Sequence, residues 1–179
     1  WYWVEARDRA QPTEDTKSTH AIYRIATKGF KPVIPNFDLS SVAGQVEALK
    51  SPAVNVRGAA FYSLVKSGSA AVPELKKLLE DSSQYIRARA VWVLAAIGGS
   101  GVQEVEKLLG SDDPQFKILA YRALRHFHSA SLLKYAAKMS KDSSSAVRRE
   151  VALSMRNIPI EKSYSVMMEI ANRYDGKDE

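Results

Sequence analysis

Histidine is the most chemically versatile residue type in this chain, and it occurs three times, at His20, His126 and His128. His126 and His128 lie two residues apart, which separates their side chains by about 200° on a helix, so they cannot share a metal ion there. The chain has no cysteine, which excludes disulfides, thiolate ligands and a cysteine nucleophile. We therefore predict surface histidines near a helix end, no metal site and no cofactor.

No set of residues for nucleophilic or acid–base catalysis stands out. The serines fall mostly in turns, and none has the G-x-S-x-G frame that positions a serine nucleophile. The GGSG run at residues 98–101 lacks the lysine and the preceding strand of a phosphate-binding loop. Acidic residues are scattered over helix starts and turns, where they favour caps and the helix dipole. We predict no catalytic residue, and we expect that the chain is not an enzyme.

Arginine and aromatic side chains remain as groups that could bind a ligand. The run YIRARAVWVLAAIG, residues 85–98, holds Arg87, Arg89 and Trp92 in an otherwise apolar stretch. The formal net charge of +6 and the pI near 9.5 permit an acidic partner, but this charge is modest for 179 residues. Whether these arginines contact a ligand or hold the scaffold together depends on the elements that position them.

Those elements follow from an internal repeat. Four apolar–basic pairs recur at spacings of 30, 30 and 31 residues, namely Val56-Arg57, Ile86-Arg87, Phe116-Lys117 and Val147-Arg148. Ala or Val follows three positions after each basic residue, and Leu or Met follows seven positions after it. Upstream, the runs VEALKSP, LKKLLEDSS, VEKLLGSDD and AAKMSKDSS end in turns rich in Asp, Ser and Pro. Each unit therefore predicts two helices joined by a short turn.

One helix pair cannot bury its apolar face alone, so the pairs must stack. The VR opening of the second helix, the Asp-rich turn before it and the Ala and Leu that follow resemble the short, bilin-lyase-type form of the HEAT-like repeat family. The resemblance implies an all-α fold, a right-handed, armadillo-like α-solenoid of about four helix pairs, over residues 36–179. We place the units at about 39–68, 70–98, 101–129 and 130–160, with a partial fifth unit at 162–175.

The first 35 residues do not share the repeat. WYWVEARDRA and HAIYRIATKG are rich in aromatic and β-branched residues and predict a short two-strand β segment, and Pro32 and Pro35 predict an extended linker. We interpret residues 1–35 as the remnant of an upstream domain. The chain begins at Trp1 and its fifth unit has a single helix, so we expect it to be a piece of a longer protein.

The order of IYRI, a proline-containing linker and HEAT-like repeats resembles a junction in bacterial sugar-dehydrogenase-type proteins, of the sorbosone or soluble glucose dehydrogenase kind. In that family a β-propeller precedes the repeats. The resemblance implies a periplasmic or secreted protein whose catalytic and quinone-binding residues lie in propeller blades outside this sequence. It transfers no catalytic residue and no haem site to this chain. No apolar run approaches the length of a membrane span.

The basic residue of each pair is predicted to be a structural anchor. With Arg87 at 0° on a helical wheel, Ala90 and Leu94 lie at about 300° and 340°, so the anchor sits at the margin of the packed side. A partly buried cation needs a partner, and aspartates in the preceding turns could supply one. The expected pairs are Arg87 with Asp81, Arg148 with Asp142 and Lys117 with Asp112 or Asp113, whereas Arg57 has no acid in its turn.

A second set of side chains on the same helices points away from the packed side. Positions two, five and nine after the anchor lie between about 140° and 200°, the side that commonly lines the concave face of an α-solenoid. Exposed Trp and Tyr beside Arg is the composition of a binding hot spot. The predicted partner-binding residues are Tyr62, Arg89, Trp92, Arg122, His126 and Leu153. The alternative is that neighbouring domains of the same polypeptide cover this stripe.

Two functions remain in view. The first is a non-catalytic repeat scaffold that binds a protein or neighbouring domains. The second is a nucleic-acid-binding domain, because HEAT-like alkylpurine DNA glycosylases use a concave face with basic and aromatic residues like Arg89, Trp92 and Arg122. Phosphate tracking needs a continuous basic path, however, and Glu150 interrupts the stripe. An enzymatic function as a glycosylase or bilin lyase has no acid or chromophore residue to carry it, so we favour the scaffold.

Overall fold

The computed structural model describes residues 28–29, 36–174 and 176. The chain divides into two units, Trp1–Asn36 and Phe37–Glu179. Apart from a turn at residues 28–29, the predicted β segment and linker at 1–35 lie outside the described residues, so the two strands stay a prediction. Every regular element in the described part of the chain is a helix.

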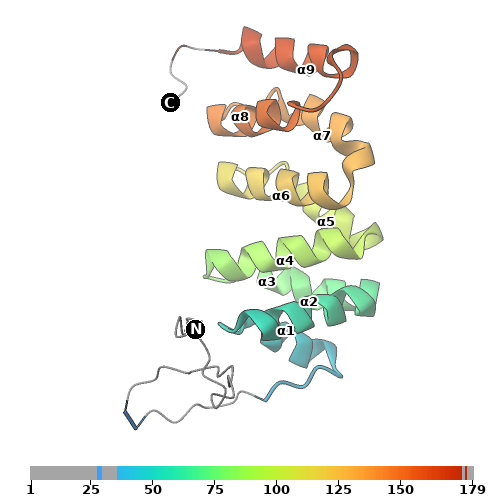
Figure 1. Cartoon of the computed structure of the whole chain (residues 1–179), viewed down its shortest axis with the longest axis vertical. Helices are drawn as coiled ribbons and strands as arrows, with labels where there is room; N and C mark the ends of the chain where they lie inside the picture. Colours follow the sequence, from blue (N-terminus) through green and yellow to red (C-terminus); the bar gives the residue numbers. More distant parts are fainter. Residues whose placement is uncertain (1–27, 30–35, 175, 177–179) are drawn as a thin grey trace, which may run out of the picture. The chain divides into compact units, whose positions relative to one another are not determined.

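The second unit is built from consecutive helix pairs (Figure 1). The helices are α1 (Val42–Lys50), α2 (Val54–Ser67), α3 (Val72–Leu78), α4 (Gln84–Ile97), α5 (Gly99–Leu108), α6 (Pro114–Phe127), α7 (Leu132–Met139), α8 (Ser145–Ser154) and α9 (Ile160–Asn172). Two 3₁₀ turns, at Gly68–Ala71 and Ser129–Ser131, lead into α3 and α7. The second helices of the pairs, α2, α4, α6 and α8, contact one another in succession and form one layer of a helical solenoid.

Local sequence signals explain where these helices begin and end. The Ser41 hydroxyl caps α1 by accepting a hydrogen bond from the Gly44 amide at 3.2 Å. Pro114 opens α6, and the Asp113 carboxylate before it accepts from the Gln115 amide. The helices α2 and α4 end at Gly68 and Gly98, whose φ angles of 60° and 79° favour glycine.

The core runs along the stack between the two helices of each pair. The positions three and seven residues after the anchors are buried in all four units, as the repeat predicts; they are Ala60, Ala90, Ala120 and Val151, and Leu64, Leu94, Leu124 and Met155. Gly101 lets α5 approach α4 closely, because a Cβ atom there would lie 2.3 Å from the Leu94 carbonyl oxygen. The last helix, α9, packs on α7 and α8 and leaves Ile160, Tyr164 and Met167 exposed.

Candidate functional site

Three of the four anchors make the same contact in different units. One nitrogen of each guanidinium donates to two backbone carbonyls of the preceding turn, six and five residues earlier in the chain. The pairs are Arg57 Nη1 with the carbonyls of Ser51 (3.1 Å) and Pro52 (2.6 Å), Arg87 Nη1 with Asp81 (2.8 Å) and Ser82 (3.3 Å), and Arg148 Nη1 with Asp142 and Ser143 (both 2.9 Å). The carbonyls at the end of a helix lack partners within that helix. An arginine that donates hydrogen bonds to them therefore holds the turn against the next helix.

The expected carboxylate partners of Arg87 and Arg148 are therefore wrong. Backbone carbonyls replace them, which explains why Arg57 needs no acid in its turn. The aspartate side chains stabilise the turn itself, because Asp81 Oδ1 accepts from the Ser83 amide at 2.8 Å and Asp142 Oδ1 from the Ser144 amide at 2.9 Å. The hydroxyls of Ser51 and Ser111 do the same for the amides of Ala53 and Asp113.

Lys117 departs from this pattern. Its Nζ lies 2.7 Å from Asp142 Oδ2, in the turn of the following unit, and both side chains are largely buried. The expected partners, Asp112 and Asp113, are wrong, and Asp113 caps α6 instead. Lys117 thus ties the third unit to the fourth, whereas the arginine anchors tie a turn to its own unit.

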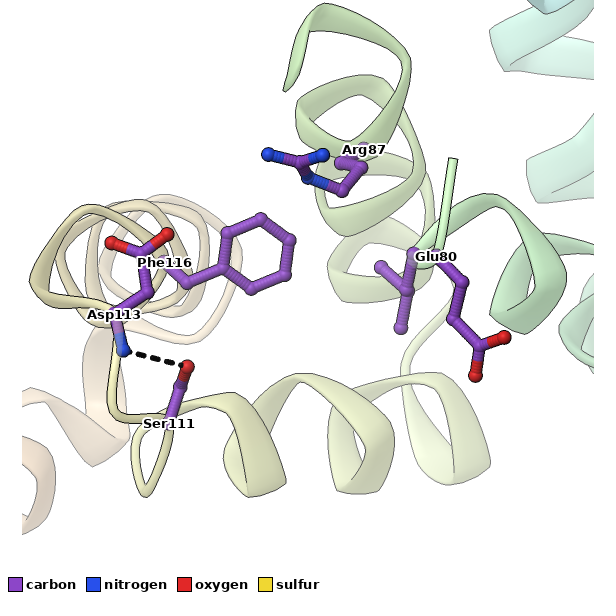
Figure 2. Close-up of a pocket in the computed structure, with 6 residues that line it drawn as sticks. Glu80, Arg87, Ser111, Asp113 and Phe116 are labelled. Carbon is purple, nitrogen blue, oxygen red and sulfur yellow. Dashed lines mark hydrogen bonds between the residues drawn. The ribbon is translucent and has the colours of Figure 1, made fainter. Parts of the chain in front are cut away.

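A hollow of about 300 Å³ lies where Arg87 meets the third unit, and Figure 2 shows it. The Arg87 guanidinium carbon lies 5.5 Å from the centre of the Phe116 ring, a cation–π contact between α4 and α6. The polar atoms of Ser111 and Asp113 are engaged in turn and cap hydrogen bonds, and the Glu80 carboxylate points away from the hollow. These contacts make the hollow a seam between the second and third units.

The predicted partner-binding residues lie on α2, α4, α6 and α8, and we call the surface they form the second-helix face: Tyr62, Arg89, Trp92, Arg122, His126 and Leu153. Tyr62 and Leu153, at its two ends, are 75% and 63% exposed. Arg122 and His126 are exposed as well, whereas Arg89 and Trp92 are half-buried. The face therefore has exposed ends and a more recessed stretch along α4.

Aromatic rings connect three successive second helices on this face. Trp92 on α4 lies edge-on to His126 and Phe127 on α6, with ring centroids 5.4 and 5.8 Å apart. Phe127 also lies 6.5 Å from Phe61 on α2, so side chains of the first and third units meet across α4. Phe61 and Phe127 were not among the predicted residues, because a helical wheel treats each helix alone and these contacts arise between helices.

Arg89 reaches back to the first unit. Its Nη1 donates to the carbonyls of Leu49 and Ser51, at 2.9 and 3.4 Å, and Arg57 donates to the same Ser51 oxygen. Burial, and secondly the charge of Arg57, lower the pKa of Arg89 below its usual value. Among the described residues, neither guanidinium has a carboxylate partner.

These two arginines line a groove of about 330 Å³ between α2 and α4. Its other lining residues are mostly apolar, and the full set is Leu49, Val54, Arg57, Gly58, Phe61, Ala88, Arg89 and Trp92. Arg89 and Trp92 were predicted to bind a partner, whereas Arg57 was predicted to be a structural anchor alone. The groove combines apolar walls with two cations that lack a counter-charge in the described part of the chain.

On the half of the face formed by α6 and α8, two arginines are paired with a glutamate. Arg122 Nη2 lies 2.5 Å from Glu150 Oε2, and Arg125 Nη1 lies 3.5 Å from Glu150 Oε1. The hydrogen bond to Glu150 raises the pKa of Arg122. Glu150, which the wheel placed on the side away from the core, is in fact buried, because two arginines of the preceding unit cover it.

The two described histidines contact protein groups. His128 Nε2 lies 2.8 Å from the Ala95 carbonyl, so this nitrogen carries the proton, and His126 packs on Trp92. Within residues 28–29, 36–174 and 176, no group of three or more histidine and acidic side chains could hold a metal ion. In the same residues, no helix is both long and apolar enough to cross a membrane.

A family model of HEAT repeats matches residues 42–110 and 102–178. These matches cover most of the chain, and they fall on the helix pairs described above. The chain therefore belongs to the HEAT repeat family, which confirms the resemblance drawn from the VR-containing units. A comparison with curated proteins finds no match.

Proposed function

We propose that the chain is a non-catalytic HEAT-repeat scaffold whose second-helix face binds a protein partner or a neighbouring domain. The observation that carries this proposal is the exposure of Tyr62 and Leu153 at the two ends of the face, with an aromatic cluster of Phe61, Trp92 and Phe127 between them. Large exposed apolar and aromatic side chains on one surface mark sites of association, because covering them removes apolar area from water. HEAT repeats typically mediate protein interactions.

Nucleic-acid binding is the second candidate. Arg57 and Arg89 have no carboxylate partner in the described part of the chain, which favours an anionic ligand. A duplex, however, needs a continuous row of cations along its phosphates, and Glu150 on α8 neutralises Arg122 and Arg125 on α6. The charge distribution therefore supports a local anionic contact better than phosphate tracking.

We also propose a wider setting, as a repeat module of a larger bacterial redox protein in the periplasm or outside the cell. This proposal rests on the resemblance of the IYRI run and its linker to a propeller–HEAT junction. The residues that carry it lie outside the described ones, and the family match concerns only the helical repeats. Quinone-dependent sugar oxidation by the isolated chain would contradict a non-catalytic role within such a protein.

The binding face can be mapped with a photocrosslinking amino acid. The probe replaces Tyr62 in one protein and Gln103 in a control, because Gln103 is also exposed but lies on α5, a first helix. Both proteins are irradiated in an extract of the cells that produce the chain. We expect a discrete adduct from position 62 and none from position 103. Adducts of equal yield from both positions would contradict a specific second-helix face.

A further inference from the structure

We propose that the groove between α2 and α4 binds an acidic peptide segment of a protein partner. A carboxylate of the segment pairs with Arg57 and Arg89, and an adjacent bulky apolar side chain packs against Phe61 and Trp92. The inference rests on the proposed partner-binding function and names the chemistry of the partner at one end of the second-helix face.

The two arginines keep unused hydrogen-bonding capacity. All their protein hydrogen bonds in the described residues come from Nη1 and go to the carbonyls of Leu49, Ser51 and Pro52. The Nε and Nη2 donors of both guanidinium groups have no protein acceptor there. A carboxylate offers two oxygens in the geometry that such donors fit, and the resulting charge-assisted bonds are strong ones.

The local balance of charge at the groove is positive. Arg57 and Arg89 share the Ser51 carbonyl as an acceptor, so two like charges come close together without an acid beside them in the described part of the chain. Burial, and secondly the like charge of Arg57, lower the pKa of Arg89. The N-cap of α2, Ala53, has no side-chain cap, so the positive end of this helix dipole also lies beside the groove at Val54. Each of these contributions favours an anionic occupant.

The groove also has an apolar wall. Leu49, Phe61, Ala88 and Trp92 line the groove, and Val54 at its rim is 73% exposed. A volume of about 330 Å³ lies at the small end of the range for ligand pockets. The groove therefore suits one bulky side chain and its flanking carboxylate, as an extended peptide presents them.

A nucleic acid fits these features less well. Its phosphates would need further cations beyond the groove, but the next ones along the face, Arg122 and Arg125, are paired with Glu150. An acidic peptide needs only the local charge and the apolar wall.

The test is a titration of the full chain with fluorescein-labelled peptides at about 50 mM salt, followed by fluorescence anisotropy. The acidic peptide has about nine residues, with a central phenylalanine flanked by glutamates, and its matched control has glutamine in place of every glutamate. We expect the acidic peptide to bind at least about tenfold more tightly, because only a carboxylate makes charge-assisted bonds with the two arginines.

Variants of the chain locate the binding. Arg57→Gln and Arg89→Gln each remove one cation from the groove and should weaken the acidic peptide about tenfold. Arg87→Gln is the matched control, since Arg87 makes the same two carbonyl contacts in the next unit but lies outside the groove. Arg89→Lys keeps the charge and should retain part of the affinity. Circular dichroism melts verify that each variant is folded.

A direct readout does not depend on those variants. The chain has three tryptophans, Trp1, Trp3 and Trp92, so Trp1→Phe/Trp3→Phe leaves Trp92 as the sole indole fluorophore. Titration with the acidic peptide should change the fluorescence of Trp92 with the same dependence on peptide concentration as the anisotropy. Equal affinity for the acidic and glutamine peptides, or no weakening with Arg57→Gln and Arg89→Gln, overturns the proposal. A labelled DNA duplex that binds more tightly through the same arginines also overturns it. The photocrosslinking at position 62 tests partner binding separately, so the two proposals can fail independently.

Discussion

Arg122 and Glu150 form an ion pair between the third and fourth units in which the arginine is exposed and the glutamate is buried. A buried carboxylate that loses its cations bears the full cost of desolvation. The pair therefore does two things at once: it fastens α8 to α6, and it removes the positive charge from this half of the second-helix face.

Glu150→Gln tests both effects. The amide keeps the shape but leaves Arg122 and Arg125 uncompensated, so we expect the free energy of unfolding to fall by about 1–3 kcal/mol. We also expect weak, salt-sensitive DNA binding to increase, because the basic path becomes more continuous. Urea denaturation and a duplex titration measure the two effects. Unchanged stability would show that the ion pair does not hold α8 in place.

Because Arg87 contacts backbone carbonyls and not a carboxylate, substitutions of Arg87 and of Asp81 should differ in their effect on the free energy of unfolding. Arg87→Met should lower the free energy of unfolding by about 2 kcal/mol, because two backbone carbonyls lose a charged donor. Asp81→Asn should change it by less than about 0.5 kcal/mol, because the amide oxygen still accepts from Ser83. Urea denaturation measures both variants. Equal losses of unfolding free energy would indicate that the Asp81 carboxylate is the partner of Arg87 after all.

Gly101 tests the close approach of α5 to α4. Gly101→Ala places a Cβ atom 2.3 Å from the Leu94 carbonyl oxygen, so the helices must separate, and we expect a loss of about 2–4 kcal/mol. Gly110→Ala is the matched control, since its nearest neighbour would lie at 3.4 Å. Thermal melts compare the two. A similar Tm for both variants would mean that the stack accommodates the methyl group without moving.

The hydrogen bond of Tyr135 should make the stability of the folded chain depend on pH in the alkaline range. Its hydroxyl donates to Glu106 Oε1 at 2.8 Å, and burial, followed by this hydrogen bond, raises the pKa of Tyr135 from 10.0 to about 12. The unfolded chain therefore loses this proton before the folded chain does, so the stabilisation is complete below about pH 10 and is lost as the pH rises towards 12.

Tyr135→Phe removes this contribution. The variant should be less stable than the natural chain near pH 8, by about 1 kcal/mol for the lost hydrogen bond, and the difference should shrink by pH 11. Urea denaturation at the two pH values gives the comparison. A difference that stays constant with pH would contradict the raised pKa of Tyr135.

The repeat was predictable because its signals are local. Alanine and leucine at fixed distances from Arg57 and Arg87 encode one buried stripe per helix, and glycines encode the helix ends at Gly68 and Gly98. The partners of the anchors were not predictable in this way. A backbone carbonyl accepts without any side-chain signature, so the nearby aspartate of the preceding turn, Asp81, was predicted in its place.

The details of the candidate site depend on contacts between units. The burial of Glu150 and the meeting of Phe61 with Phe127 follow from how successive second helices rotate against one another. One helical wheel cannot supply that rotation. For the same reason Arg89 was predicted to point away from the packed side, whereas its guanidinium lies on the carbonyl of Leu49 in the preceding unit.

The second-helix face is the central claim, and the yield of photocrosslinked partner at single positions tests it most directly. The probe replaces Tyr62, Leu153 or the control Gln103, and mass spectrometry identifies each adduct. The account predicts the same partner protein at positions 62 and 153, at the two ends of the face, and no adduct at position 103. Adducts that form at position 103 and not at positions 62 and 153 would contradict it.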